Sequence, residues 1–148
     1  MKVEEAEELQ TSFVRILVVD DFAPWQAFVR MHLGQDPTLR VIGFASDGLE
    51  AVQKALELQP DLILMDINLP GLNGIEAALQ IQALAPRSAI LFLSEDSDPD
   101  VVQAALSVGG RGYILKSKVT RDLVVGTETA LRGKRFVSPG LIDGHDWT

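Results

Sequence analysis

Five short apolar segments recur along the chain, and a longer stretch with a different hydrophobic period separates each from the next. The segments are VRILVVD (14–20), LRVIGFA (39–45), DLILMD (61–66), AILFLS (89–94) and GYILK (112–116). Nearly every residue in them is apolar, which is typical of strands buried on both faces of a parallel sheet. In the longer stretches apolar residues recur at helical spacing, as Trp25, Phe28 and Val29 do. The pattern therefore predicts strands and helices in strict alternation.

Helix-start and helix-stop residues fall between these segments. Asp98-Pro99 is typical of an N-cap followed by proline at the first helical position, and Asn73 is predicted to cap a helix that begins near Gly74. Gly109-Gly110 is expected to end the fourth helix. We therefore predict an α/β fold: a five-stranded parallel sheet with five helices and right-handed crossovers.

Composition excludes several other classes of protein. With 13 basic and 21 acidic residues, the net charge of −8 repels phosphate backbones, so direct nucleic-acid binding is not expected. The absence of cysteine excludes a disulfide scaffold and a thiol nucleophile. No apolar run is long enough for a membrane span, and the acidic MKVEEAEELQ start is unlike a signal peptide. We expect one cytoplasmic domain preceded by a flexible acidic tail over residues 1–12.

Polar side chains end four of the five predicted strands. The first strand ends in Asp20 and Asp21, the third in Asp66, the fourth in Ser94 and the fifth in Lys116. Ligands of open parallel sheets bind beyond the carboxyl ends of the strands, so these side chains are expected to converge. Each alone has an ordinary alternative, such as helix capping or a solvated charge. Together, three carboxylates repel one another unless a cation is present, and their oxygens suit Mg²⁺.

Asp66 is the best placed of these residues to act as a nucleophile. It ends the strand in DLILMDINLPGLNG, directly before a turn that contains Pro70 and Gly71. A carboxylate can attack phosphorus to form an acyl phosphate. A bound metal ion and the Lys116 ammonium would offset the charge on the transferring group. The five side chains therefore indicate phosphoryl chemistry.

These residues give the chain a strong resemblance to the receiver domains of two-component response regulators, across about residues 13–135. Spacings of 45, 28 and 22 residues lead from Asp21 to Asp66, Ser94 and Lys116. The segment from VGGRGYILK to RFVSP further resembles the end of receivers in the NarL/LuxR-type subfamily. The resemblance implies a flavodoxin-like sheet with strand order 2-1-3-4-5.

The resemblance also implies a metal site and a phosphoryl donor. Asp66 would accept a phosphoryl group from the phosphohistidine of a sensor histidine kinase. Asp21 and Asp66, with the backbone carbonyl of Asn68, would ligate Mg²⁺ or Mn²⁺, and Asp20 would assist through water. Lys116 would pair with the phosphoryl oxygens.

A switch is implied rather than a chemical product, so no enzyme activity is expected beyond the domain's own phosphorylation and dephosphorylation. The Ser94 hydroxyl would move to the phosphoryl group, and Tyr113 would turn inward as it does. The surface tied to both residues comprises the helix expected at about 99–109, the strand at 112–116 and the helix at about 119–132. It could contact a second copy or an effector domain, and Asp122 is expected among its exposed residues.

Two other functions remain open at this point. Glu95 follows Ser94 where receivers usually carry a small residue, and a bulky anion there favours a pseudo-receiver that binds partners without phosphorylation. An aspartyl-nucleophile phosphatase of the haloacid-dehalogenase type is the other alternative. It needs a second aspartate two residues after the nucleophile, whereas Asp20 and Asp21 are adjacent.

Residues 136–148 are expected to form a linker or tail, because Ser138-Pro139 corresponds to the start of the linker in the NarL/LuxR-type subfamily. Only LIDGHDWT follows Gly140, which is too short for a helix-turn-helix DNA-binding domain. We therefore expect either a stand-alone receiver or a piece of a longer transcriptional regulator.

Overall fold

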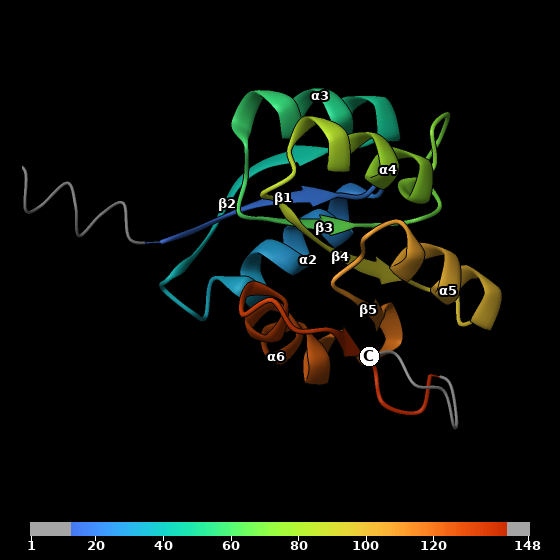
Figure 1. The fold of residues 1–148 in the computed structure, drawn as a ribbon. Helices are drawn as coiled ribbons and strands as arrows, with labels where there is room; N and C mark the ends of the chain where they lie inside the picture. The colour runs from blue at the N-terminus through green and yellow to red at the C-terminus, as the bar shows by residue number, and fades with distance from the viewer. Residues whose placement is uncertain (1–12, 142–148) are drawn as a thin grey trace, which may run out of the picture.

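Six parallel strands form one sheet with helices on both faces in the computed structural model, which describes residues 13–141 (Figure 1). The elements are β1 (Val14–Val19), α2 (Ala23–Leu33), β2 (Leu39–Ala45), α3 (Gly48–Leu58), β3 (Leu62–Met65), α4 (Gly74–Leu84), β4 (Ala89–Ser94), α5 (Pro99–Ser107), β5 (Gly112–Leu115), the 3₁₀ turn η1 (Lys116–Lys118), α6 (Val119–Leu131) and β6 (Phe136–Val137). The strand order is β2-β1-β3-β4-β5-β6. This confirms the predicted doubly wound α/β fold and the order 2-1-3-4-5.

Two separate hydrophobic cores, one on each face of the sheet, explain why the strands are apolar at nearly every position. Successive side chains of a strand point to opposite faces. Leu17 and Val19 of β1 therefore pack in the core under α3, α4 and α5, whereas Ile16 and Val18 pack in the core over α2 and α6. Figure 1 shows α3 and α4 on one side of the sheet and α2 and α6 on the other. A strand between two such layers needs apolar residues at every position.

The two helix caps that the sequence predicts, at the starts of α4 and α5, are both present. Asn73 accepts a hydrogen bond from the Glu76 amide, and the Glu76 side chain accepts one from the Asn73 amide, so α4 begins with a capping box. Asp98 caps α5, with Pro99 at its first position. These caps fix the loops that surround the ends of β3 and β4.

A sixth strand corrects the expectation of five. Residues 136–137 pair with β5 in parallel, with Phe136 opposite Gly112 and Val137 opposite Tyr113. The predicted linker over residues 136–148 therefore begins inside the sheet. A strand of two residues is too short to leave a periodic pattern, which is why the sequence does not reveal it. The predicted tail over residues 1–12 lies outside the described residues, as do residues 142–148. Among the described helices, none has the length and apolarity to cross a bilayer.

Candidate functional site

Three carboxylates meet at the carboxyl edge of the sheet. Asp20 and Asp21 follow β1, and Asp66 follows the neighbouring strand β3. One oxygen atom from each of the three lies within 4.8 Å of the others. Asp20 and Asp66 are buried, and Asp21 is exposed. The predicted convergence of these three side chains therefore occurs, and it leaves one open side toward solvent.

The backbone around Asp66 holds its carboxylate in place. The Asp66 amide donates a hydrogen bond to the Val19 carbonyl at 3.0 Å, and its Oδ1 accepts one from the Ile67 amide at 2.8 Å. The start of α4 packs directly on this loop, since a Cβ atom on Gly74 would lie 1.9 Å from the Asp66 carbonyl oxygen. Glycine at position 74 is thus required for the close approach of helix and loop.

Lys116 supplies the positive charge of the site. Its Nζ lies 2.6 Å from Asp20 Oδ2 and 3.5 Å from Asp66 Oδ2. It also lies 5.0 Å from the centre of the Trp25 ring, within range of a cation–π interaction. Burial alone lowers the pKa of Lys116, but the Asp20 hydrogen bond and the charge of Asp66 outweigh it, so the pKa rises. The lysine therefore stays protonated between the two carboxylates.

Burial alone lowers the pKa of Lys116 but raises the pKa of Asp66. Desolvation raises the pKa of its carboxyl from 3.8 to about 6, and the charge of Asp20 adds to the shift, although Lys116 opposes it. A carboxylate in a poorly hydrated site with another carboxylate nearby is costly to ionise. Any cation that enters the site would relieve this cost.

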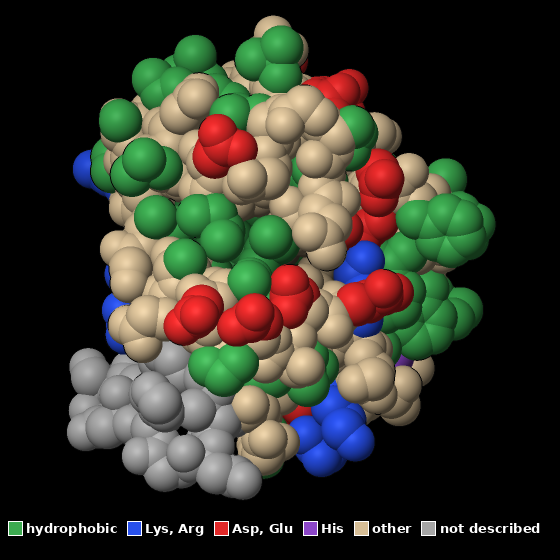
Figure 2. Space-filling model, turned by 90° about the vertical axis from the view of Figure 1, so that its right-hand side faces the viewer, with side chains coloured by type: hydrophobic (Ala, Val, Ile, Leu, Met, Phe, Trp, Pro, Cys, Tyr) green, Lys and Arg blue, Asp and Glu red, His purple; other side chains and the backbone are tan. Residues whose placement is uncertain are grey.

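A cleft of about 300 Å³ opens over Asp66. It is lined by Asp20, Asp21, Phe22, Trp25, Asp66, Asn68, Glu95 and Lys116. Figure 2 looks onto the face toward which the strand arrows of Figure 1 point, and acidic side chains gather across its middle. The loop between β4 and α5 contributes to this charge with Glu95, Asp96 and Asp98, and the first turn of α5 contributes Asp100. The approach to Asp66 is therefore acidic.

Ser94 and Tyr113 lie beside this loop. Both side chains are buried, and Tyr113 stacks on Phe92 at 6.4 Å between ring centres. The Tyr113 hydroxyl donates to the Asp96 carbonyl at 2.6 Å, and Ser94 Oγ accepts from the Asp96 amide at 3.1 Å. Burial raises the pKa of Tyr113 to about 12, which keeps that hydroxyl protonated. Tyr113 thus already points inward in this structure, tied to the same residue as Ser94.

The three carboxylates fit a divalent metal ion. When all three are ionised, Lys116 balances one of their charges and leaves two. Mg²⁺ binds through one or two carboxylates and keeps several water molecules, which matches two buried carboxylates beside an exposed one. Asn68 lines the same cleft. An oxygen-rich, net-negative site open on one side can therefore hold such an ion.

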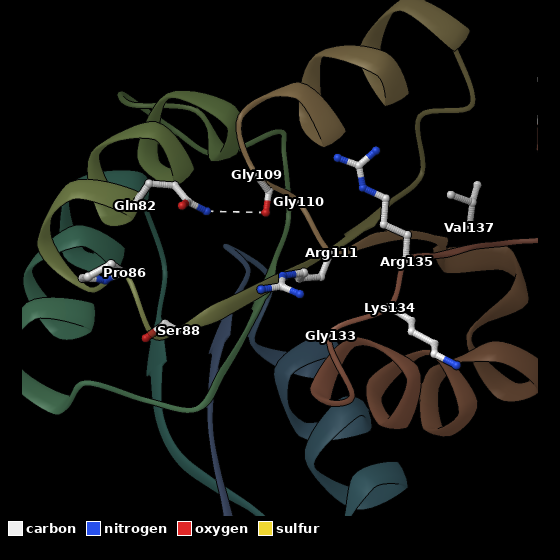
Figure 3. A pocket seen from close by; sticks show the side chains of 10 residues that line it. All are labelled: Gln82, Pro86, Ser88, Gly109, Gly110, Arg111, Gly133, Lys134, Arg135 and Val137. Atoms are coloured by element: carbon white, nitrogen blue, oxygen red, sulfur yellow. Dashed lines mark hydrogen bonds between the residues drawn. The ribbon is translucent and has the colours of Figure 1, made fainter. Parts of the chain in front are cut away.

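A larger cleft, of about 860 Å³, lies at the opposite edge of the sheet (Figure 3). Arg111, Lys134 and Arg135 line it, and in Figure 3 the Arg135 side chain points toward the turn before β5. The helices α4, α5 and α6 all end at this edge, and Arg135 donates to the Leu106 carbonyl in the last turn of α5. These cations therefore complement the negative ends of the helices.

Comparison with known proteins assigns this arrangement to a family. The model of the response regulator receiver domain matches residues 16–126. The chain belongs to this family. The receiver domain is 32% identical over 129 residues to the response regulator VraR of Staphylococcus aureus, covering 87% of this chain and 62% of VraR. It is 44% identical over 105 residues to a protein-glutamate methylesterase/protein-glutamine glutaminase of Thermotoga maritima, covering 70% of this chain and 30% of that protein.

Solved structures give the same assignment. A LuxR-family two-component response regulator from Aurantimonas matches with a TM-score of 0.84 and 32% identity, over 88% of this chain and 93% of that one. The receiver domain spans less than two thirds of the length of both curated relatives. The chain therefore corresponds to only a part of each of these relatives.

The surroundings of two side chains, Trp25 and Asp122, are not predicted from the sequence. Trp25 is predicted there only as an aromatic of a helix, yet it lines the cleft and faces Lys116. Asp122, expected on the exposed face of α6, is instead buried at 3% exposure and bonded to Arg121 and Ser138. Its position in a helical stripe of mixed polarity gives no signal of burial, because its partner Ser138 directly follows β6, a strand that the pattern does not reveal.

Proposed function

We propose that the receiver domain is a phosphorylation-dependent switch of a cytoplasmic two-component phosphorelay, with Asp66 as the phosphoacceptor. The observation that carries the proposal is the Asp66 carboxylate at the floor of an open cleft, 3.5 Å from the Lys116 ammonium and beside two further carboxylates. This arrangement offers a nucleophile together with positive charge for the oxygens of an incoming group, which is most of what phosphoryl transfer requires.

In the proposed reaction, a carboxylate oxygen of Asp66 forms a bond to the phosphorus of a phosphohistidine on a sensor histidine kinase. The phosphorus–nitrogen bond breaks, and the imidazole leaves with its electron pair and takes up a proton. Lys116 would then turn from Asp20 toward the phosphoryl oxygens. The domain would catalyse only this transfer and the later hydrolysis of its own acyl phosphate.

The metal site in this proposal comprises Asp20, Asp21 and Asp66 with the backbone carbonyl of Asn68. Mg²⁺ or Mn²⁺, when bound, supplies charge that offsets the phosphoryl oxygens. The raised pKa of Asp66 supports this assignment, because Lys116 alone does not offset the burial of this carboxylate beside Asp20, and a cation bound there would favour its ionised form. Asp21, the exposed member, stays accessible to a hydrated ion.

The signal would leave through Ser94 and Tyr113. Both contact Asp96, so a Ser94 hydroxyl that turns toward a phosphoryl group would release one of the two bonds that hold this loop. We propose that the surface formed by α5, β5 and α6 responds and binds a second copy or an effector domain. Similarity to the transcriptional regulatory protein DegU of Brevibacillus brevis, at 30% identity over 133 residues, supports a role in a transcriptional regulator.

A pseudo-receiver is the second candidate, and one observation favours it. Glu95 lines the cleft beside Asp66, so a fourth carboxylate stands where an anionic donor must enter. In that case the domain would bind its partner without accepting a phosphoryl group.

Incubation with acetyl phosphate and Mg²⁺, read by intact-protein mass, separates these functions. The switch predicts one phosphoryl group per chain, lost slowly, and none on Asp66→Asn, on Asp21→Ala or in excess EDTA. Continuous release of phosphate over many turnovers would instead support a phosphatase. A wild-type chain that stays unlabelled, while its fold is intact, would support the pseudo-receiver.

A further inference from the structure

The peptide that follows α6 returns to the sheet beside the strand that leads to Lys116. After Val137 pairs with Tyr113, the Ser138 amide donates to the Tyr113 carbonyl at 2.9 Å, which extends the β5–β6 ladder. Ser138 is only 1% exposed. A serine this deeply buried at the end of an edge strand needs partners for its hydroxyl.

The Ser138 hydroxyl has two partners. It accepts a hydrogen bond from the Leu115 amide at 3.2 Å and donates one to Asp122 Oδ2 at 2.8 Å. Asp122 is itself 3% exposed, and the Arg121 guanidinium donates to both of its oxygens, at 2.7 and 2.9 Å. The buried carboxylate is therefore neutralised and fully bonded, and the network is satisfied rather than strained.

These two partners lie on either side of Lys116. Leu115 is the last residue of β5, Lys116 opens the turn η1, and Asp122 lies in the first turn of α6. One hydroxyl thus joins the residue before Lys116 to the helix that follows it. The 3₁₀ turn between them has no side-chain cap of its own. This connection thus spans the turn that carries Lys116, whose Nζ lies 2.6 Å from Asp20 Oδ2 and 3.5 Å from Asp66 Oδ2.

We propose that Ser138 and Asp122 are positioning residues of the phosphoacceptor site, which hold the segment from Leu115 to Asp122 so that the Lys116 ammonium faces Asp66. The inference rests on the proposed function of Asp66. It also makes the peptide that leaves the sheet at Ser138 part of the site, because that peptide is bonded to Tyr113 and Leu115 at the same time.

The experiment compares Ser138→Ala with Ser88→Ala in the full chain. Ser88 is a matched control, since it is also buried and its hydroxyl donates to the Pro60 carbonyl, but it lies at the other edge of the sheet, before β4. The initial rate of labelling by acetyl phosphate with Mg²⁺ is measured for both variants. Urea unfolding curves first establish that each variant is folded under the conditions of the assay. We expect Ser138→Ala to be about tenfold slower than wild type, because small displacements of a charged group are costly in transfer reactions. Ser88→Ala should match wild type.

A double-mutant cycle with Lys116→Ala separates positioning from general stability. If Ser138 acts through Lys116, Ser138→Ala should change the labelling rate by less than about twofold in the Lys116→Ala background. Equal rates for Ser138→Ala and Ser88→Ala, or a tenfold loss that persists without Lys116, would overturn the inference. Should Ser138→Ala not fold, Asp122→Asn takes its place in the cycle. A wild-type chain that is not labelled would overturn the proposed function itself, a result visible before any variant is compared.

Discussion

Removing the Asp66 charge is expected to stabilise the folded domain when no divalent cation is present. The pKa of this carboxyl rises from 3.8 to about 6 on folding, mainly through burial. Each pKa unit corresponds to about 1.4 kcal/mol, so ionised Asp66 lowers the free energy of unfolding by about 3 kcal/mol at neutral pH. Asp66→Asn keeps the shape of the side chain and removes this cost.

The effect depends on pH with a definite sign. Between pH 3.8 and about 6 the native carboxyl retains a proton that the unfolded chain has lost, so wild-type stability falls as pH rises through this interval. Below it both states are protonated and the contribution vanishes. Above it both are ionised and the full cost remains. The difference between Asp66→Asn and wild type should therefore grow from near zero at pH 3.8 to its full value above pH 6.

Urea unfolding in EDTA at pH 4 and pH 7.5 measures this difference. Glu57→Gln, which neutralises an exposed carboxylate, is the control and should change little at either pH. Added Mg²⁺ should narrow the gap at pH 7.5, because it stabilises wild type by binding the native state. This expectation is refuted if Asp66→Asn is no more stable than wild type at pH 7.5, or if it is more stable by the same amount at pH 4. In either case burial does not determine the pKa of the Asp66 carboxyl.

Three further outcomes follow from the site. Gly74→Ala should lower the free energy of unfolding in urea by at least about 2 kcal/mol, because its Cβ would overlap the Asp66 carbonyl. Gly71→Ala, with open space around it and a φ of +69°, should lower it by about 1 kcal/mol through backbone strain alone. Equal losses for the two variants would contradict the close packing of α4. Glu95→Ala should speed labelling by acetyl phosphate roughly threefold or more by removing a like charge from the cleft, and an unchanged rate would show that Glu95 does not control entry. Trp25→Phe should abolish most of the change in tryptophan fluorescence that Mg²⁺ and beryllofluoride produce in wild type, because Trp25 faces Lys116; a full signal in the variant would place the source elsewhere.

The sequence predicts well those features that depend on one segment at a time. Each strand is apolar at nearly every position, and the charged residue that ends it follows directly, so the residue pattern alone assigns Asp20, Asp66 and Lys116 to one edge of the sheet. The caps at Asn73 and Asp98 are likewise local, because a cap and the amide it bonds are two or three residues apart.

Features that join distant segments could not be predicted in this way. Strand β6 has two residues, and its place in the sheet depends on β5, which lies more than twenty positions earlier. The burial of Asp122 depends in turn on Ser138, and the contact of Trp25 with Lys116 depends on how α2 lies over the sheet edge. Side-chain periodicity carries no information about such pairs, since either partner alone fits an ordinary exposed or half-buried position.

The two edges of the sheet carry opposite charge, and this gives the domain an electric dipole. Acidic residues gather at the carboxyl edge, around Asp66, in the loop from Glu95 to Asp98 and at Asp100 in the first turn of α5. Arg111, Lys134 and Arg135 lie at the amino edge (Figures 2 and 3). The field of a partner with a positive surface would therefore turn the carboxyl edge of the domain toward that partner during diffusion. This orientation raises the association rate constant without adding a contact to the complex. Because the field extends only about 8 Å at physiological ionic strength, added salt should slow association far more than it speeds dissociation. For such a partner, orientation in solution would precede any contact at the cleft.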